Sequence, residues 1–175
     1  MKRRCIGIIM AVLIAVLIAT FSMSGCKNTT NAKTASVATT AAAPAATKAA
    51  GYVGKIAEKA LGNSYFREVV FTGKYSQLVV MSLLPSEEIG MEVHPTVDQF
   101  FRVESGEGKV IIDGIESLVT DGAGIIVPAG SEHNIINLST SSDLKLYTIY
   151  SPPNHKDGVI HKTKKDAVAD TTDHL

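Results

Sequence analysis

The feature that most constrains the fold is a series of short apolar runs between residues 66 and 150. Each run is rich in Val, Ile, Phe or Tyr, and Gly, Pro, Asp, Asn or Ser residues lie between most of them. Such a series predicts an all-β domain, either a sandwich or a barrel. Asp113-Gly114, between two runs, indicates a tight hairpin. The expected strands are Phe66–Thr72, Gln77–Leu84, Gly90–His94, Gln99–Glu104, Lys109–Asp113, Glu116–Thr120, Ile125–Val127, His133–Asn137 and Leu144–Tyr150.

A short helix is expected on each side of these strands. Residues 53–61 have helical apolar spacing and end before Gly62, a common stop signal. A second short helix is expected over Lys164–Ala169. The polar tail carries His155, Asp157 and His161, which either fold back over the domain or lie in solvent. We favour the solvated interpretation and expect the last residues to fray.

The N-terminus has the pattern of an export signal. Lys2, Arg3 and Arg4 precede an apolar stretch at 6–21, and Ser24-Gly25-Cys26 follows. This order is typical of a secretory signal peptide, and the small pair before Cys26 resembles a bacterial lipobox. The resemblance implies that residues 1–25 are removed and that lipid on Cys26 anchors the protein at the extracytoplasmic face of the cell membrane. The alternative is an uncleaved transmembrane anchor, although the apolar stretch is short for a span of about 20 residues.

Residues 26–50 are almost all Ala, Thr, Lys and Asn, and such a segment buries too little apolar surface to fold. We interpret them as a flexible tether and residues 51–175 as the folded domain. Loss of residues 1–25 removes three of the 17 basic residues and none of the 17 acidic ones, which leaves a formal charge of −3. A weakly acidic chain without a basic run argues against a nucleic-acid partner.

Polar side chains interrupt the apolar runs at a few positions. Alternate residues of a strand share a face, so Glu92 and His94 are expected to point the same way. Met91 and Val93 would then face away and pack between the sheets. Gln99 opens the next run, and His133 opens a later one. These groups indicate a metal site, and the plain alternative is that each His is satisfied in the core or at the surface.

Two sets of residues resemble the motifs of the cupin superfamily. The second cupin motif is matched at every fixed position, by Gly122, Pro128, Gly130, His133 and Asn137. The first motif, His-x-His-x4-Glu-x6-Gly, is matched in spacing by Glu92, His94, Gln99 and Gly106. It departs at two ligand positions, where Glu92 replaces the first His and Gln99 replaces the Glu. Over most of residues 64–168 the chain is similar to small single-domain bacterial cupins.

This resemblance implies an RmlC-like jelly roll, the double-stranded β-helix barrel. Family members bind one divalent metal in the barrel mouth, and the matching positions here would be Glu92, His94, Gln99 and His133. Two imidazoles, one carboxylate and one amide oxygen suit Mn, Fe, Ni or Zn. Because Glu92 replaces the charge lost at Gln99, the carboxylate count stays at one. Glu92 is also the candidate acid or base.

Three functions follow from this pattern. The protein is an enzyme acting on a small oxygen-rich molecule such as a sugar or organic acid, a binding module without turnover, or a structural cupin with an empty site. A homodimer is expected, because pairing would protect exposed strand edges.

Overall fold

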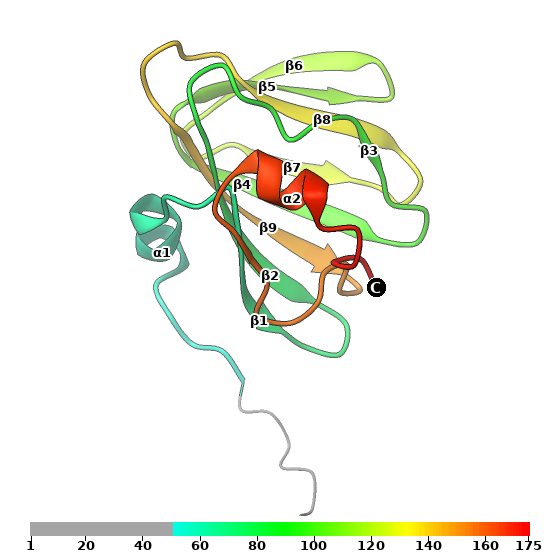
Figure 1. The fold of residues 1–175 in the computed structure, drawn as a ribbon. Coiled ribbons are helices and arrows are strands. Elements are labelled where there is room, and N and C mark those ends of the chain that lie inside the picture. Colours follow the sequence, from blue (N-terminus) through cyan, green and yellow to red (C-terminus); the bar gives the residue numbers. More distant parts are fainter. Residues whose placement is uncertain (1–50) are drawn as a thin grey trace, which may run out of the picture. The chain divides into compact units, whose positions relative to one another are not determined.

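The computed structural model describes residues 51–175. The signal peptide, lipidation site and tether predicted for residues 1–50 therefore lie outside the described residues. Within residues 51–175 the chain forms two antiparallel sheets that face each other, with one short helix before them and one after (Figure 1). The elements are α1 (Ile56–Gly62), β1 (Arg67–Thr72), β2 (Gln77–Leu83), β3 (Glu92–Val93), β4 (Asp98–Ser105), β5 (Glu107–Ile112), β6 (Ile115–Thr120), β7 (Gly124–Val127), β8 (Glu132–Asn137), β9 (Leu144–Ser151), β10 (Ile160–His161) and α2 (Lys164–Ala169).

The strand order is that of a jelly roll. The larger sheet has the order β10-β1-β2-β9-β4-β7, and the smaller has the order β3-β8-β5-β6. The predicted all-β class and both short helices are confirmed. The hairpin at Asp113-Gly114 is also confirmed: Ile112 pairs with Ile115, and both turn residues have positive φ, 48° and 80°. That geometry matches the right-handed twist of the two strands.

The hydrophobic core lies between the two sheets. Met81, Phe101 and Leu146 from the larger sheet share one buried cluster with Val110 and Ile135 from the smaller sheet. All five are at most 4% exposed. Since strands place alternate side chains on one face, β4 shows the alternation expected of a sheet with one face on the core. Phe101 and Val103 thus line the interior on the same side as Gln99.

The second strand departs from alternation because it is covered on both faces. All seven residues of β2 are buried. Helix α1 packs against β2, β9 and β4 on the side away from the core, and its Ala60 is fully buried. The continuous apolar run of β2 therefore reflects two packed faces.

The tail is part of the fold, and the prediction of a solvated end is wrong. His155 and His161 are buried, at 1% and 5% exposed, and Asp173, two residues from the C-terminus, is 1% exposed. Asp157 alone among the three predicted tail residues is exposed. The two-residue strand β10, which we did not predict, pairs with β1. Thr163 and Asp166 form a reciprocal capping box that starts α2.

The predicted burial of Met91 and Val93 is also wrong. Their exposed fractions are 52% and 49%. They alternate with Glu92 and His94 along the chain, as expected, but β3 is an edge strand of the smaller sheet. These side chains therefore meet solvent.

No helix within residues 51–175 is long and apolar enough to cross a membrane.

Candidate metal centre

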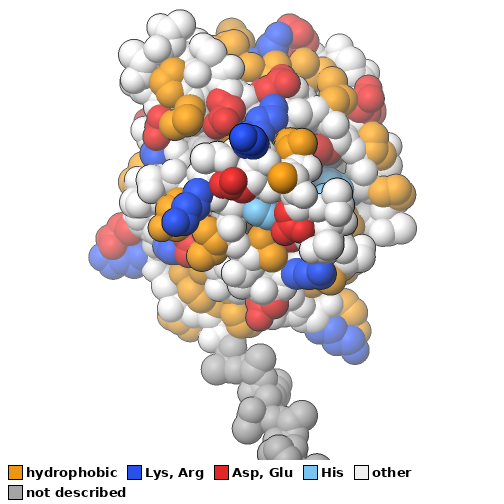
Figure 2. Space-filling view, viewed as in Figure 1, with side chains coloured by type: hydrophobic (Ala, Val, Ile, Leu, Met, Phe, Trp, Pro, Cys, Tyr) orange, Lys and Arg blue, Asp and Glu red, His pale blue; other side chains and the backbone are white. Residues whose placement is uncertain are grey.

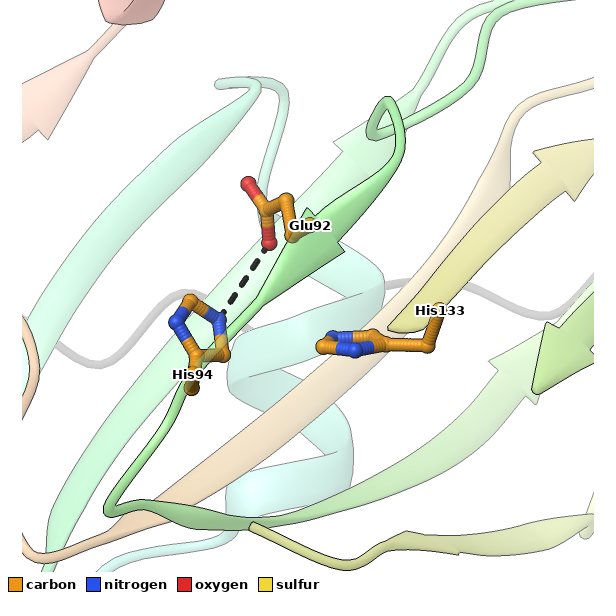
Figure 3. Close-up of side chains that lie close together, drawn as sticks. All are labelled: Glu92, His94 and His133. Carbon is orange, nitrogen blue, oxygen red and sulfur yellow. Dashed lines mark ion pairs between the residues drawn. The ribbon is translucent and has the colours of Figure 1, made fainter. Parts of the chain in front are cut away.

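Three metal-ligating side chains converge at one end of the space between the sheets (Figure 3). Glu92 lies on β3, His94 directly follows it, and His133 lies on β8. Glu92 and His133 are register partners across the β3–β8 pair, so their side chains are neighbours. One ligand atom from each of the three residues lies within 4.8 Å of the others. The sequence prediction that these residues meet is confirmed.

The turn that carries His94 is tied to the turn before His133. The carbonyl of His94 accepts a hydrogen bond from the Gly130 amide at 2.9 Å. Asp98 Oδ1 accepts another from the Ala129 amide, also at 2.9 Å. Asp98 thus caps this corner of the chain. These two bonds fix the 94–98 corner against the Pro128–Gly130 bend and hold both histidines in register.

Gln99 reaches the same point from the larger sheet. Its Oε1 lies 2.9 Å from His133 Nε2, while its Nε2 donates to Thr148 Oγ1 at 3.1 Å. On its other side, His133 Nδ1 donates to the Ser131 carbonyl at 3.1 Å. Burial lowers the pKa of His133, although the Ser131 hydrogen bond raises it. With the proton on Nδ1, a neutral His133 has its Nε2 lone pair on the Gln99 side, which is the form in which both groups could ligate one ion.

The distances between neighbouring donor atoms test whether one cation fits among them. Ligands about 2.1 Å from one ion lie about 3.0 Å apart at right angles and about 3.4 Å apart in a tetrahedron. The Gln99–His133 separation is 2.9 Å, and Glu92 Oε2 lies 3.4 Å from His94 Nε2. His94 Nε2 is buried and has no hydrogen-bond partner among residues 51–175. The donor set thus fits a divalent metal.

Glu92 is held between two nitrogen groups. Its Oε1 lies 3.7 Å from Arg67, and its Oε2 faces His94. Burial raises the pKa of Glu92, but the contact with His94 and the charge of Arg67 outweigh it, and the net pKa is below the usual 4.5. Glu92 is therefore ionised at neutral pH, as a metal ligand must be.

Tyr150 closes the inner wall of the site. It is 1% exposed, and its ring meets His94 edge-on at 5.7 Å between centroids. Burial raises the pKa of its hydroxyl, against the charge of Arg67. The phenol therefore stays protonated over the physiological range and cannot serve as a base there.

A solvent-open pocket of about 340 Å³ adjoins the candidate ligands. We call it the mouth pocket; its lining residues are Glu92, Val93, His94, Pro95, Asn154 and His174. Figure 2 shows histidine atoms recessed on this face among acidic and hydrophobic groups. The pocket gives a small molecule access to Glu92 and His94.

The other motif residues shape the backbone around the site. Asn137 is 1% exposed, and its amide nitrogen donates to the carbonyls of Leu83, Leu84 and Ser142. Gly106 has a φ of 105°, and a Cβ there would lie 2.9 Å from the Asp143 carbonyl. Gly122 and Gly130 also have positive φ, and the Pro128 carbonyl accepts from the Ser131 amide to close the bend.

Sequence reasoning missed the groups behind Glu92. Arg67 is 4% exposed and also lies 3.4 Å from Asp173. Asp173 Oδ2 accepts from His155 Nδ1 at 2.7 Å. An arginine opening an apolar strand was the one available signal, because a buried Arg needs a carboxylate partner. Nothing in the tail sequence identified Asp173 as that partner.

Comparison with known proteins agrees with this geometry. Residues 79–150 match the cupin domain model. The chain is similar to BH2720 from Bacillus halodurans, whose crystal structure is known. The sequence identity is 40% and the TM-score is 0.66, and the match covers 67% of this chain and 93% of that one. The chain therefore belongs to the cupin superfamily.

Two further proteins are similar to this chain in sequence. Protein YrkC of Bacillus subtilis (strain 168) is 48% identical over 113 residues, which are 61% of this chain and 60% of YrkC. Protein L612 of Acanthamoeba polyphaga mimivirus is 44% identical over 112 residues, which are 62% of this chain and 70% of L612. The match thus spans about three fifths of the length of YrkC.

Proposed function

We propose that this cupin binds one divalent metal ion through Glu92, His94, Gln99 and His133, and that the loaded site acts on a small oxygen-rich molecule. The observation that carries the proposal is that ligand atoms of Glu92, His94 and His133 lie within 4.8 Å of one another. Gln99 joins them through Oε1, which lies 2.9 Å from His133 Nε2. His94 Nε2 supports it, because this buried atom makes no hydrogen bond among residues 51–175 and its ion-pair partner at 3.4 Å, Glu92 Oε2, is itself a candidate ligand.

The donor atoms of the site narrow the choice of metal ion. Two imidazoles, one carboxylate and one amide oxygen make a mixed nitrogen and oxygen shell, which suits Mn, Fe, Ni or Zn. One carboxylate leaves a formal charge of +1 on the site. A bound ion would supply Lewis-acid polarisation to a carbonyl or hydroxyl oxygen.

The surroundings define the ligand class. The mouth pocket has about 340 Å³ and exposes the side chains of Asn154 and His174 beside Glu92 and His94. This volume is at the lower end of ordinary ligand sites. A sugar or organic acid of a few carbons, with oxygen atoms toward the ligand shell, fits this size and polarity.

Glu92 is suited to accepting a proton and poorly suited to donating one. Its lowered pKa keeps the carboxylate ionised at neutral pH. In an enzyme it would serve as a ligand or base, and the proton would go to His174 at the rim or to solvent.

The lack of a proton donor in the proposed shell favours a second candidate function, a binding module without turnover. No group of the proposed shell is a ready proton donor, and Tyr150 faces inward. Incubation of the metal-loaded domain with small sugars and organic acids separates the two. Product formation supports the enzyme, and tight binding of unchanged ligand supports the module.

Elemental analysis of the domain purified without oxygen tests the metal itself. One equivalent of a divalent ion supports the proposal. Thermal unfolding with and without a chelator tests the third candidate, a structural cupin with an empty site. A folded-state ligand stabilises by mass action, so a midpoint that does not move after chelation argues for the empty site.

The location and assembly predicted from the sequence are part of the proposal. Lipid on Cys26 would hold the domain at the extracytoplasmic face of the membrane. A homodimer would use an exposed strand edge, and β6 supplies one with Ile115 and Leu118 at 72% and 78% exposed.

A further inference from the structure

The C-terminal residues 170–175 are anchored next to the metal centre. The Lys156 amide donates to the Asp173 carbonyl at 2.9 Å, and the Leu175 amide donates to the Asn154 carbonyl at 3.1 Å. The segment they pair with is held in turn by Gln77, whose Oε1 accepts from the His155 amide at 2.9 Å. Figure 1 shows α2 and the C-terminus in front of the space between the sheets.

This anchoring places Asp173 on Arg67. Arg67 Nη1 lies 3.4 Å from Asp173 Oδ2, and Arg67 Nη2 lies 3.7 Å from Glu92 Oε1. The side chains of Arg67 and Asp173 are 5% and 1% exposed. Because a buried charge is costly without a counter-charge, Arg67 needs these carboxylates. Arg67 therefore pairs with two carboxylates, that of Glu92 inside the site and that of Asp173 from the tail.

The sharing fixes which oxygen of Glu92 faces the candidate ligands. Arg67 contacts Oε1, and Oε2 is left 3.4 Å from His94 Nε2. An arginine without a second partner tends to bind both oxygens of a carboxylate in a two-pronged ion pair. Asp173 occupies the other prong of Arg67 and so leaves Glu92 Oε2 free.

We propose that Asp173 is a positioning residue for the metal centre, acting through Arg67 to keep one oxygen of Glu92 available to the ion. This inference rests on the proposed metal function. It makes Asp173 in the C-terminal tail part of the site, although this residue does not belong to the proposed ligand set.

The test is a double-mutant cycle on metal affinity. Asp173→Asn should lower the affinity for Zn²⁺ or Mn²⁺ by about tenfold, as the loss of a partner behind a ligand does. In a Glu92→Gln background Asp173→Asn should lower the metal affinity by about threefold or less, because the neutral amide at position 92 cannot form an ion pair with Arg67. Titration calorimetry on the full domain measures both, with circular dichroism to check folding.

A matched control is Asp170→Asn. Asp170 is also a tail carboxylate, but its hydrogen bonds go to Thr172 and His161. It should change affinity by less than about twofold. Arg67→Lys serves as the second variant if Asp173→Asn does not fold. It keeps the positive charge but loses the guanidinium group that contacts both carboxylates. It should weaken metal binding more when position 92 is Glu than when it is Gln.

The outcomes separate the two proposals. If the wild-type domain binds no divalent metal, the proposed function fails and this inference fails with it. If the wild type binds metal and Asp173→Asn leaves affinity unchanged, the inference alone is overturned. An equal loss in both backgrounds also overturns it, since that result indicates a general structural role for the tail.

Discussion

Nε2 of His133 lies 2.9 Å from Oε1 of Gln99, a contact between β8 of the smaller sheet and β4 of the larger one. The Ser131 carbonyl accepts a hydrogen bond from Nδ1, and with the proton on Nδ1 the imidazole has its Nε2 lone pair on the side of the amide oxygen. A divalent ion beside them would be coordinated by both atoms.

Removal of either histidine should remove the metal. We expect His94→Ala and His133→Ala each to reduce bound metal from about one equivalent to near zero, because each loses a donor of the proposed shell. Metal content of the purified variants measures this. Glu116→Gln, an exposed carboxylate on β6, is the control and should retain full metal. Unchanged stoichiometry in both histidine variants would show that the ion is bound elsewhere.

A carboxylate at position 99 should strengthen metal binding. Gln99 is 1% exposed, so Gln99→Glu buries a charge that destabilises the metal-free domain by about 1–3 kcal/mol. With metal present the added charge should raise affinity by about tenfold or more. Gln99→Met, of similar shape but without the oxygen, should lower affinity. Calorimetry and urea unfolding measure the two effects, and a Glu variant that binds metal no better than wild type would contradict Gln99 as a ligand.

The metal-free domain should lose stability as the pH falls below 6.5. Burial lowers the pKa of both His133 and His155 from 6.5; Arg67 also lowers that of His155, while Asp173 opposes the shift. Below pH 6.5 the unfolded chain therefore binds protons that the folded chain does not. The contribution of these two neutral, buried histidines to the free energy of unfolding is fully present above pH 6.5. It is lost as the pH falls, at a rate that approaches about 1.4 kcal/mol per pH unit for each histidine.

Urea unfolding at pH 7.5, 6.5 and 5.5, in the presence of chelator, measures this dependence. His155→Gln should reduce the slope by the share of one histidine. A free energy of unfolding that stays constant or rises between pH 6.5 and 5.5 would show that these histidines are charged in the folded state.

The amide of Asn137 should be essential for stability. Its nitrogen donates to three carbonyls, and its oxygen accepts from the Ser139 amide. Asn137→Asp would place an acceptor against those carbonyls and should cost about 3 kcal/mol or more. Urea unfolding measures the loss. Ser141→Ala, an exposed change nearby, should stay within about 0.5 kcal/mol, and an Asp variant as stable as this control would contradict the prediction.

Lipid attachment is testable in the full-length chain. We expect labelled palmitate to be incorporated into the wild type and into Cys5→Ser, because the predicted signal peptide carries Cys5 away. Cys26→Ser should lose both the label and the membrane fraction. Label retained in Cys26→Ser would place the lipid elsewhere or favour the uncleaved anchor.

The sequence alone was sufficient to determine the all-β class, the strands β1 to β9 and the meeting of Glu92, His94 and His133. These follow from local signals: apolar runs, turn residues, the period of two in a strand, and motif spacing. Exposure at β3 was predicted wrongly, because Met91 and Val93 have the pattern of a packed strand and only the sheet order shows that β3 is an edge.

Only the tertiary structure decided what surrounds the ligands. Arg67 and Asp173 are separated by 106 residues, and neither position has a local pattern that marks it as a partner of the other. The tail is polar in composition, yet it is buried because its backbone pairs with residues 154–156 and its carboxylate neutralises an arginine inside the fold. Charge pairing over such a separation depends on how the chain packs, which short-range sequence patterns do not encode.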